Sequence, residues 1–191
     1  MRSKGWRIVA AVLIALVVGV GSGLARLRWF VSLGGVDVGP WQTSTAIGSS
    51  SADALLRAAI AVNAILAMNR DEAVYFIARD DSAGKPLDGA CRYRVSGTDP
   101  EARWWSLTVY GSDRFLVPNP QHRYSESLDS VHHDSNGHFD ITLARQPQDG
   151  NWIALPDGRF LLTLRLYNPS PALVADPSRA QLPTIVAEGC R

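Results

Sequence analysis

The sequence predicts a mainly β protein, an antiparallel β-sandwich or jelly-roll-like domain with one packed helix, preceded by an N-terminal transmembrane helix. Three observations predict this fold class. An uncharged apolar run occupies residues 8–25, and apolar residues at helical spacing follow between residues 51 and 67. From Glu72 onward, about six to eight short apolar runs are separated by turn residues at intervals of roughly ten residues, which is typical of sandwiches and barrels.

The apolar run at 8–25 is long enough to cross a bilayer. As a helix it would extend about 27 Å at about 1.5 Å per residue, close to the thickness of the hydrocarbon core. Basic residues flank it on both sides: Arg2, Lys4 and Arg7 before it, Arg26 and Arg28 after it. The positive-inside rule then keeps the N-terminus inside and exports the rest of the chain. The alternative is a cleaved signal peptide, because Gly23 and Ala25 are small residues of the kind found before a cleavage site.

We therefore divide the 191 residues into four segments. They are a cytoplasmic basic flank (1–7), a transmembrane anchor or signal peptide (8–28), a linker (29–50) and a periplasmic β-sandwich domain (51–191). The length allows one ordinary domain besides the tether. The expected location is the inner membrane, crossed once and held by its lipid through the N-terminal helix, with the C-terminal domain in the periplasm.

Within the domain, the elements follow from local patterns. Ser51 is a candidate helix N-cap with Asp53 in the first turn, and the apolar face of the helix that follows suits packing across a sheet. The Asn-Gly pair within 134–137 predicts a hairpin turn. Predicted strands lie at 73–78, 91–95, 104–110, 115–117, 139–143, 159–167 and 183–186.

The chain has two cysteines, Cys91 and Cys190. An even number in an exported domain favours a disulfide. Such a bond would close a loop of about a hundred residues and contribute up to roughly 4–5 kcal/mol in the chain-entropy model. The alternative is two unrelated thiols; two cysteines without a neighbouring ligand pair make a poor zinc site.

Seven motifs, in their order and spacing, resemble the Domain of Unknown Function 1214 family. They are NRDEAVYF at 69–76, CRY at 91–93, WWSLTVY at 104–110, FLVPNP at 115–120, RYS at 123–125, NW at 151–152 and LRLYNP at 164–169. The resemblance implies a β-sandwich-like bacterial domain that is often exported and that follows a second β-rich domain in larger relatives. The family has no settled activity, so it lends no catalytic residues. Relatives tend to have Leu-Pro soon after the Asn-Trp pair, whereas here residues 153–155 precede Pro156, so we expect that loop to differ in shape.

Arginines on predicted strands form the main candidate site. Arg92, Arg94 and Arg165 alternate with core residues and so lie on the opposite strand faces. If those faces are covered, each arginine needs a carboxylate such as Asp71, Glu72 or Asp140. If they are open, arginines and aromatic rings could line a cleft for sugars or anionic small molecules, or form a solvated face beside core aromatics. The candidate ligand-binding residues are Arg92, Arg94, Trp104, Tyr110, Trp152, Arg165 and Tyr167.

Three histidines close together, His132, His133 and His138, are weak candidates for a metal site. Imidazole groups near carboxylates can bind zinc. However, adjacent residues on a strand point to opposite faces, so His132 and His133 would not share one ion on a regular strand. An exposed polar hairpin is the simpler interpretation, and we predict no metal and no other cofactor.

The remaining patterns exclude several classes of function. The net charge is +1 and no basic stripe follows the N-terminal end, so nucleic acid is not an expected partner. The chain has no GxSxG elbow, P-loop or GxGxxG. We therefore predict a binding or accessory module of the cell envelope, whose partner is a glycan, lipid or protein, with no catalytic residue identified. The alternative is an envelope hydrolase or glycan-processing enzyme, with a metal as one option.

Overall fold

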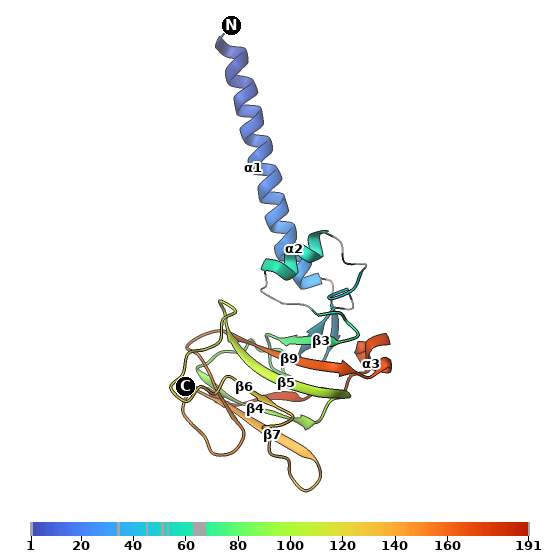
Figure 1. The fold of residues 1–191 in the computed structure, drawn as a ribbon. Helices are drawn as coiled ribbons and strands as arrows, with labels where there is room; N and C mark the ends of the chain where they lie inside the picture. The colour runs from blue at the N-terminus through green and yellow to red at the C-terminus, as the bar shows by residue number, and fades with distance from the viewer. Residues whose placement is uncertain are drawn as a thin grey trace.

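A long N-terminal helix stands away from a β-rich domain (Figure 1). The computed structural model describes residues 2–33, 35–44, 46–50, 52, 54–62 and 68–190. Helix α1 covers Arg2–Leu33 and meets the short helix α2, Ala54–Val62. Within α1, Gly5–Ala25 has a mean hydropathy of 2.6 and is not buried against the domain. By length and composition this stretch could cross a membrane, a test that a signal sequence near the N-terminus also passes.

The strands form two sheets. The six-stranded sheet has, in spatial order, β1 (Val36–Val38), β2 (Trp41–Thr43), β3 (Ala73–Ala78), β9 (Phe160–Pro169), β5 (Ala102–Gly111) and β6 (Ser125–Ser127). The four-stranded sheet has β10 (Thr184–Cys190), β4 (Cys91–Thr98), β7 (His138–Ala144) and β8 (Trp152–Ala154). Helix α3 (Pro171–Ala175) and a 3-10 turn, η1 (Pro177–Arg179), follow β9.

One hydrophobic core lies between the two sheets, because strand alternation turns one face of each toward the other. Leu107 of β5 is paired across the six-stranded sheet with Leu164 of β9, and both are buried. They belong to the same cluster as Ile141 of β7 and Ile185 of β10 in the other sheet. The prediction of a mainly β domain with two sheets and few helices is therefore confirmed.

One strand pair departs from the antiparallel prediction. β7 and β8 are parallel, with Thr142 opposite Trp152. Residues 145–151 carry the chain back alongside β7, and the amide of Asn151 holds this return by donating to the Asp140 carbonyl (3.0 Å). Because residues 145–151 bring the chain back to the end of the sheet at which β7 begins, the short strand β8 runs in the same direction as β7.

Alternation also defines the outer face of the six-stranded sheet, the face opposite the core. Tyr75 of β3 lies on this face, and its hydroxyl accepts a hydrogen bond from the backbone N–H of Met68 (3.3 Å), just after the helix α2 region. In Figure 1 the outer face is accordingly turned toward α2 and α1. The helix that the sequence predicts to pack across the sheet corresponds to α2, and among the described elements its main contact is with α1. Its predicted cap residues Ser51 and Asp53 lie outside the described residues.

The segment between the two helices contributes to the sheet. The short extended piece expected near Val36 and Val38 is β1, and β2 follows it. Trp41 of β2 is fully buried, and its indole N–H donates to the Pro183 carbonyl (2.7 Å). Much of this segment is therefore fixed to the domain.

Cys91 and Cys190 form a disulfide, as predicted. They stand opposite each other where β4 begins and β10 ends, so that strand pairing alone brings the thiols together. The bond joins residues 99 positions apart. An apolar N-terminal helix and a disulfide together indicate a membrane or extracytoplasmic location.

Candidate functional site

Arg165 is the centre of a polar and aromatic cluster on the outer face of β5 and β9. Its Nη2 donates to the Tyr110 hydroxyl (2.7 Å), and its Nη1 donates to Thr108 Oγ1 (3.2 Å). The guanidinium carbon lies 5.4 Å from the centroid of the Tyr110 ring, within the range of a cation–π contact. Among the described residues Arg165 forms no ion pair. Its positive charge is therefore held in place by neutral groups.

Two aromatic rings extend the cluster along the same strands. Trp104 and Tyr167 are direct cross-strand partners, which brings their rings to 5.3 Å between centroids. The indole N–H of Trp104 donates to a carboxylate oxygen of Asp129 (2.6 Å). Both rings are partly exposed, as are Tyr110 and Arg165.

Small hydroxyl residues lie beside the arginine on the same two strands. Ser106, Thr108 and Thr163 are buried, although they are on the outer face of the sheet. Ser106 is opposite Arg165, and Thr108 is opposite Thr163. The cluster thus combines a floor of hydroxyl groups, a fixed guanidinium and aromatic rings on both strands. We call this set (Trp104, Ser106, Thr108, Tyr110, Thr163, Arg165 and Tyr167) the outer-face cluster.

The other sequence-predicted residues lie elsewhere. Arg92 and Arg94 are on β4 in the four-stranded sheet, where both pair with Glu188 of β10; the distance from Arg92 Nε to the carboxylate is 2.9 Å. Both side chains are about half exposed, so the covered face for which Asp71, Glu72 or Asp140 was expected as partner does not occur here, and the partner is a carboxylate of the adjacent strand β10. The hydrogen bonds that Arg94 donates to the Glu188 carboxylate, and then the negative charge of that carboxylate, raise the pKa of Arg94.

Trp152 is also outside the cluster. It is buried in β8, and its indole N–H donates to the Ala144 carbonyl (2.9 Å). Of the seven candidate binding residues, the structure brings together Trp104, Tyr110, Arg165 and Tyr167.

The three histidines do not form a ligand group. His133 Nε2 lies 3.0 Å from a carboxylate oxygen of Asp99, and its ring packs edge-on against Phe139. His132 and His138 are held through their backbone N–H groups, by Asn151 and by Asp134. In the part of the chain that the structure describes, no three His, Cys, Asp or Glu residues are placed to hold a metal ion.

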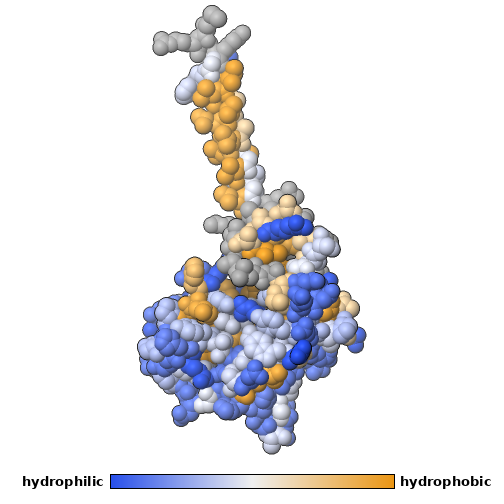
Figure 2. Space-filling model, viewed as in Figure 1, coloured by the Kyte–Doolittle hydropathy of each residue, from blue (hydrophilic) through white to orange (hydrophobic). Residues whose placement is uncertain are grey.

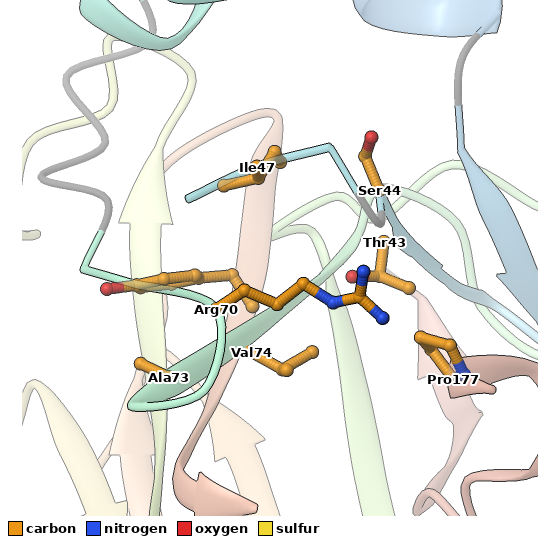
Figure 3. Close-up of a pocket in the computed structure, with 8 residues that line it drawn as sticks. Thr43, Ser44, Ile47, Arg70, Ala73, Val74 and Pro177 are labelled. Carbon is orange, nitrogen blue, oxygen red and sulfur yellow. The ribbon is translucent and has the colours of Figure 1, made fainter. Parts of the chain in front are cut away.

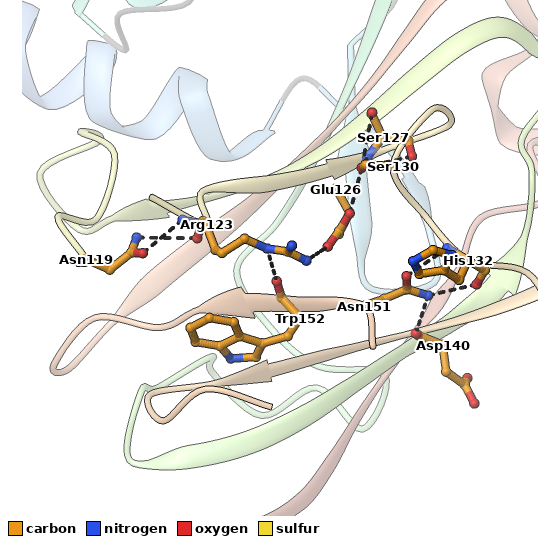
Figure 4. A network of polar contacts seen from close by, with 9 residues as sticks. All are labelled: Asn119, Arg123, Glu126, Ser127, Ser130, His132, Asp140, Asn151 and Trp152. Carbon is orange, nitrogen blue, oxygen red and sulfur yellow. Dashed lines mark hydrogen bonds and ion pairs between the residues drawn. The ribbon is translucent and has the colours of Figure 1, made fainter. Parts of the chain in front are cut away.

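A second polar network, which the sequence did not predict, joins the edges of the two sheets. Glu126 of β6 is 1% exposed and forms an ion pair with Arg123. Ser130 donates a hydrogen bond to the same carboxylate (2.6 Å), and Arg123 Nε donates to the Trp152 carbonyl on β8 (3.3 Å). Figure 4 shows Arg123 between Glu126 and Trp152. Because β6 and β8 belong to different sheets, this arginine links them.

Two asparagines of the sequence motifs fix loops around that network. Asn119 accepts from the Arg123 N–H (2.9 Å) and donates to the Val117 carbonyl (3.0 Å). Asn151 accepts from the His132 N–H and donates to the His132 carbonyl (both 2.8 Å). These amides take the place of backbone partners in the loops, so the motif residues here have a structural role. In the sequence, the only local sign of the Arg123–Glu126 ion pair is that the two residues are three positions apart.

A small hollow lies at another edge, between β2, β3 and η1 (Figure 3). Its lining consists of Thr43, Ser44, Ile47, Arg70, Ala73, Val74, Tyr75 and Pro177. Arg70 extends across it and donates to the Val174 carbonyl. The hollow has room for about one water molecule, so it is too small to hold a substrate.

The comparison with protein families decides the classification. Residues 72–171 match the family described as "Protein of unknown function (DUF1214)". The chain belongs to the DUF1214 family. The matched residues contain the whole outer-face cluster and the Arg123–Glu126 network, whereas β10 and Cys190 lie beyond them. No curated protein matches the chain in sequence.

One solved structure supports the fold of this DUF1214 domain. The VPA0106 protein from Vibrio parahaemolyticus is 24% identical with a TM-score of 0.62, over 73% of this chain and 36% of that chain. An uncharacterised protein from Burkholderia cenocepacia is 16% identical with a TM-score of 0.42, over 63% of this chain and 30% of that chain. The DUF1214 chain therefore spans about a third of the length of these two relatives.

Proposed function

We propose that this DUF1214 protein is a membrane-anchored binding module of the cell envelope that holds an anionic glycan, free or lipid-linked, on its outer-face cluster. In this proposal α1 crosses the inner membrane once and the β domain lies in the periplasm. The apolar stretch of α1 and the Cys91–Cys190 disulfide support that location.

The proposal rests on the charge and the hydrogen-bond donors of Arg165. A guanidinium has five N–H donors, and its contacts with Thr108 and Tyr110 use two of them. No carboxylate among the described residues neutralises it, unlike Arg92 and Arg94, which share Glu188. A fixed arginine with donors left over suits a carboxylate or phosphate group.

The neighbouring groups favour a glycan as the carrier of that anion. Sugar rings present C–H faces that pack on aromatic rings, and Trp104 and Tyr167 offer two such rings beside Arg165. The hydroxyl group of the partly exposed Tyr110 matches the hydroxyl groups of a sugar. Because the outer face is turned toward α1, a lipid-linked glycan would meet the cluster from the membrane side (Figure 1).

Binding of uronic-acid oligosaccharides to the full chain in lipid nanodiscs tests the proposal. Neutral oligosaccharides of the same length serve as the reference ligands. Replacing Arg165→Gln removes charged hydrogen bonds worth about 1.5–3 kcal/mol each, which corresponds to a loss of affinity of about tenfold or more. Arg94→Gln is the matched control, because Arg94 is a strand arginine on the other sheet. The proposal fails if Arg165→Gln leaves the affinity for acidic oligosaccharides unchanged, or if Arg94→Gln weakens it equally.

A further inference from the structure

The turn after β5 presents two apolar side chains to solvent. The Gly111 N–H donates to the Phe115 carbonyl (2.9 Å), and the Arg114 N–H donates to the Gly111 carbonyl (2.8 Å). Arg114 has φ 69°, the left-handed conformation typical of the last residue in a three-residue hairpin loop. Asp113 accepts from the Phe115 N–H (3.0 Å). This well-connected turn leaves Phe115 73% exposed and Leu116 45% exposed.

This turn projects from the sheet on the side from which α1 leaves. Figure 1 shows the loop that follows β5 rising toward α1, and Figure 2 shows a hydrophobic patch at that position above a largely hydrophilic surface. Most other large hydrophobic side chains exposed in the described residues belong to α1. Single exposed apolar residues are common in soluble proteins, but an adjacent pair on the side from which an apolar helix leaves is consistent with a shared apolar environment.

Arginines accompany the apolar pair. Arg114 is next to Phe115, and Arg79 follows β3 at the same end of the sheet, since β3 and β5 both run antiparallel to β9. Burial, and then the charge of Arg114, lower the pKa of Arg79, whose Nη1 also donates to the Gln42 side chain (3.4 Å). The charge of Asp80 acts on Arg79 in the opposite direction, and Asp113 lies in the same turn as Arg114. Cations beside exposed apolar residues are the pattern with which proteins bind anionic lipid surfaces.

We propose that Phe115 and Leu116 insert into the headgroup region of the same membrane that α1 crosses, with Arg114 and Arg79 facing its lipid phosphates. This inference rests on the proposed function, because it requires α1 to span the bilayer. Between Ala25, where the apolar stretch ends, and Leu33, where α1 ends, the helix rises only about 12 Å. The domain is therefore kept close to the lipid surface. A second attachment would fix the outer-face cluster toward the membrane.

Site-specific fluorescence in the full chain, reconstituted in nanodiscs that contain anionic lipid, tests the insertion. An environment-sensitive label is attached to Phe115→Cys, to Val186→Cys or to Val17→Cys, because the native cysteines are already paired. Val186 is 52% exposed on β10 of the other sheet and is the water-facing control; Val17 reports on α1. We expect nitroxide lipids to quench the labels at 17 and 115 but not at 186. Quenching at 17 with none at 115 refutes the docking alone, and no quenching at 17 refutes the anchor and the docking together.

A second measurement keeps the native apolar side chain in place. A label at Ser112→Cys, in the same turn, is compared between chains with Phe115 and with Phe115→Ser. Burial of a phenylalanine side chain favours transfer from water by about tenfold to a hundredfold, so we expect the fraction of docked domains to fall by about tenfold or more. Unchanged quenching at Ser112 in the Phe115→Ser chain would overturn the proposal.

Discussion

Replacing Arg123→Met should strongly destabilise the domain, because it leaves a buried carboxylate without its cation. Glu126 is 1% exposed, and its partners are Arg123 and the Ser130 hydroxyl. The methionine keeps the length and apolar stem of the arginine but removes the guanidinium. It also removes the hydrogen bond to the Trp152 carbonyl, and with it one link between the two sheets.

The magnitude follows from the burial of the two partners. Removing one member of a fully buried pair costs about 3–5 kcal/mol. The Arg123 side chain is 43% exposed, so water screens part of this interaction, and Ser130 still serves the carboxylate. We therefore expect a loss of about 2–3 kcal/mol in the free energy of unfolding. The double variant Arg123→Met with Glu126→Gln should lose less than the sum of the single variants, because no unpaired charge remains.

Urea unfolding of the full chain in detergent micelles measures this loss. The intrinsic fluorescence of the buried residues Trp41, Trp105 and Trp152 reports on the domain. Arg145→Met is the matched control, since Arg145 pairs with Asp157 and both side chains are exposed; such pairs contribute about 0–1 kcal/mol. A difference between Arg123→Met and Arg145→Met smaller than about 0.5 kcal/mol would show that the network does not carry the stability assigned to it.

Four further predictions concern other parts of the molecule. Reduction of Cys91–Cys190 should lower the free energy of unfolding by up to about 4–5 kcal/mol, read from the urea midpoint; an unchanged midpoint would contradict it. Arg165→Ala should cost about 1–2 kcal/mol in the same assay, whereas the exposed control Val186→Ser should stay within about 0.5 kcal/mol; equal effects would mark Arg165 as free of its contacts. Burial raises the pKa of Tyr93, so its contribution to stability is complete below about pH 10 and is lost as the pH rises through the raised pKa. In an ultraviolet titration of tyrosine ionisation, Tyr93→Phe should remove the transition at the highest pH. If that transition remains, it belongs to another tyrosine. A phosphatase fused to the C-terminus should be active outside the cytoplasm, and activity confined to the cytoplasm would refute the topology.

Strand alternation was the most informative part of the sequence. In β4 and β9 the apolar residues are at every second position, which correctly assigned residues to the core or to the opposite face before any neighbour was known. The disulfide followed from the number of cysteines and the expected compartment. These inferences depend only on local pattern or composition, so they do not require knowledge of the strand order.

Features that depend on strand order could not be predicted in the same way. Arg92 and Arg165 have equivalent patterns in the sequence, but one is beside Glu188 of β10 and the other is beside the hydroxyl groups of β5. The strands β6 and β8 have three residues each, too few to show a period. Glu126 on β6 is buried because it stands opposite Leu107 and shares its core-facing side of the sheet, and a polar run gives no sign of that.

The contrast between the two sheets explains why the binding site is proposed on one of them. On the four-stranded sheet, two arginines share one carboxylate, so their charges are compensated within the sheet. On the six-stranded sheet, Arg165 is fixed by a phenol and a threonine hydroxyl, which orient the guanidinium but leave its charge. A guanidinium that is already oriented but not neutralised can bind an anionic ligand with little additional loss of side-chain entropy. A purely structural arginine would gain more from a carboxylate, as Arg123 does with Glu126.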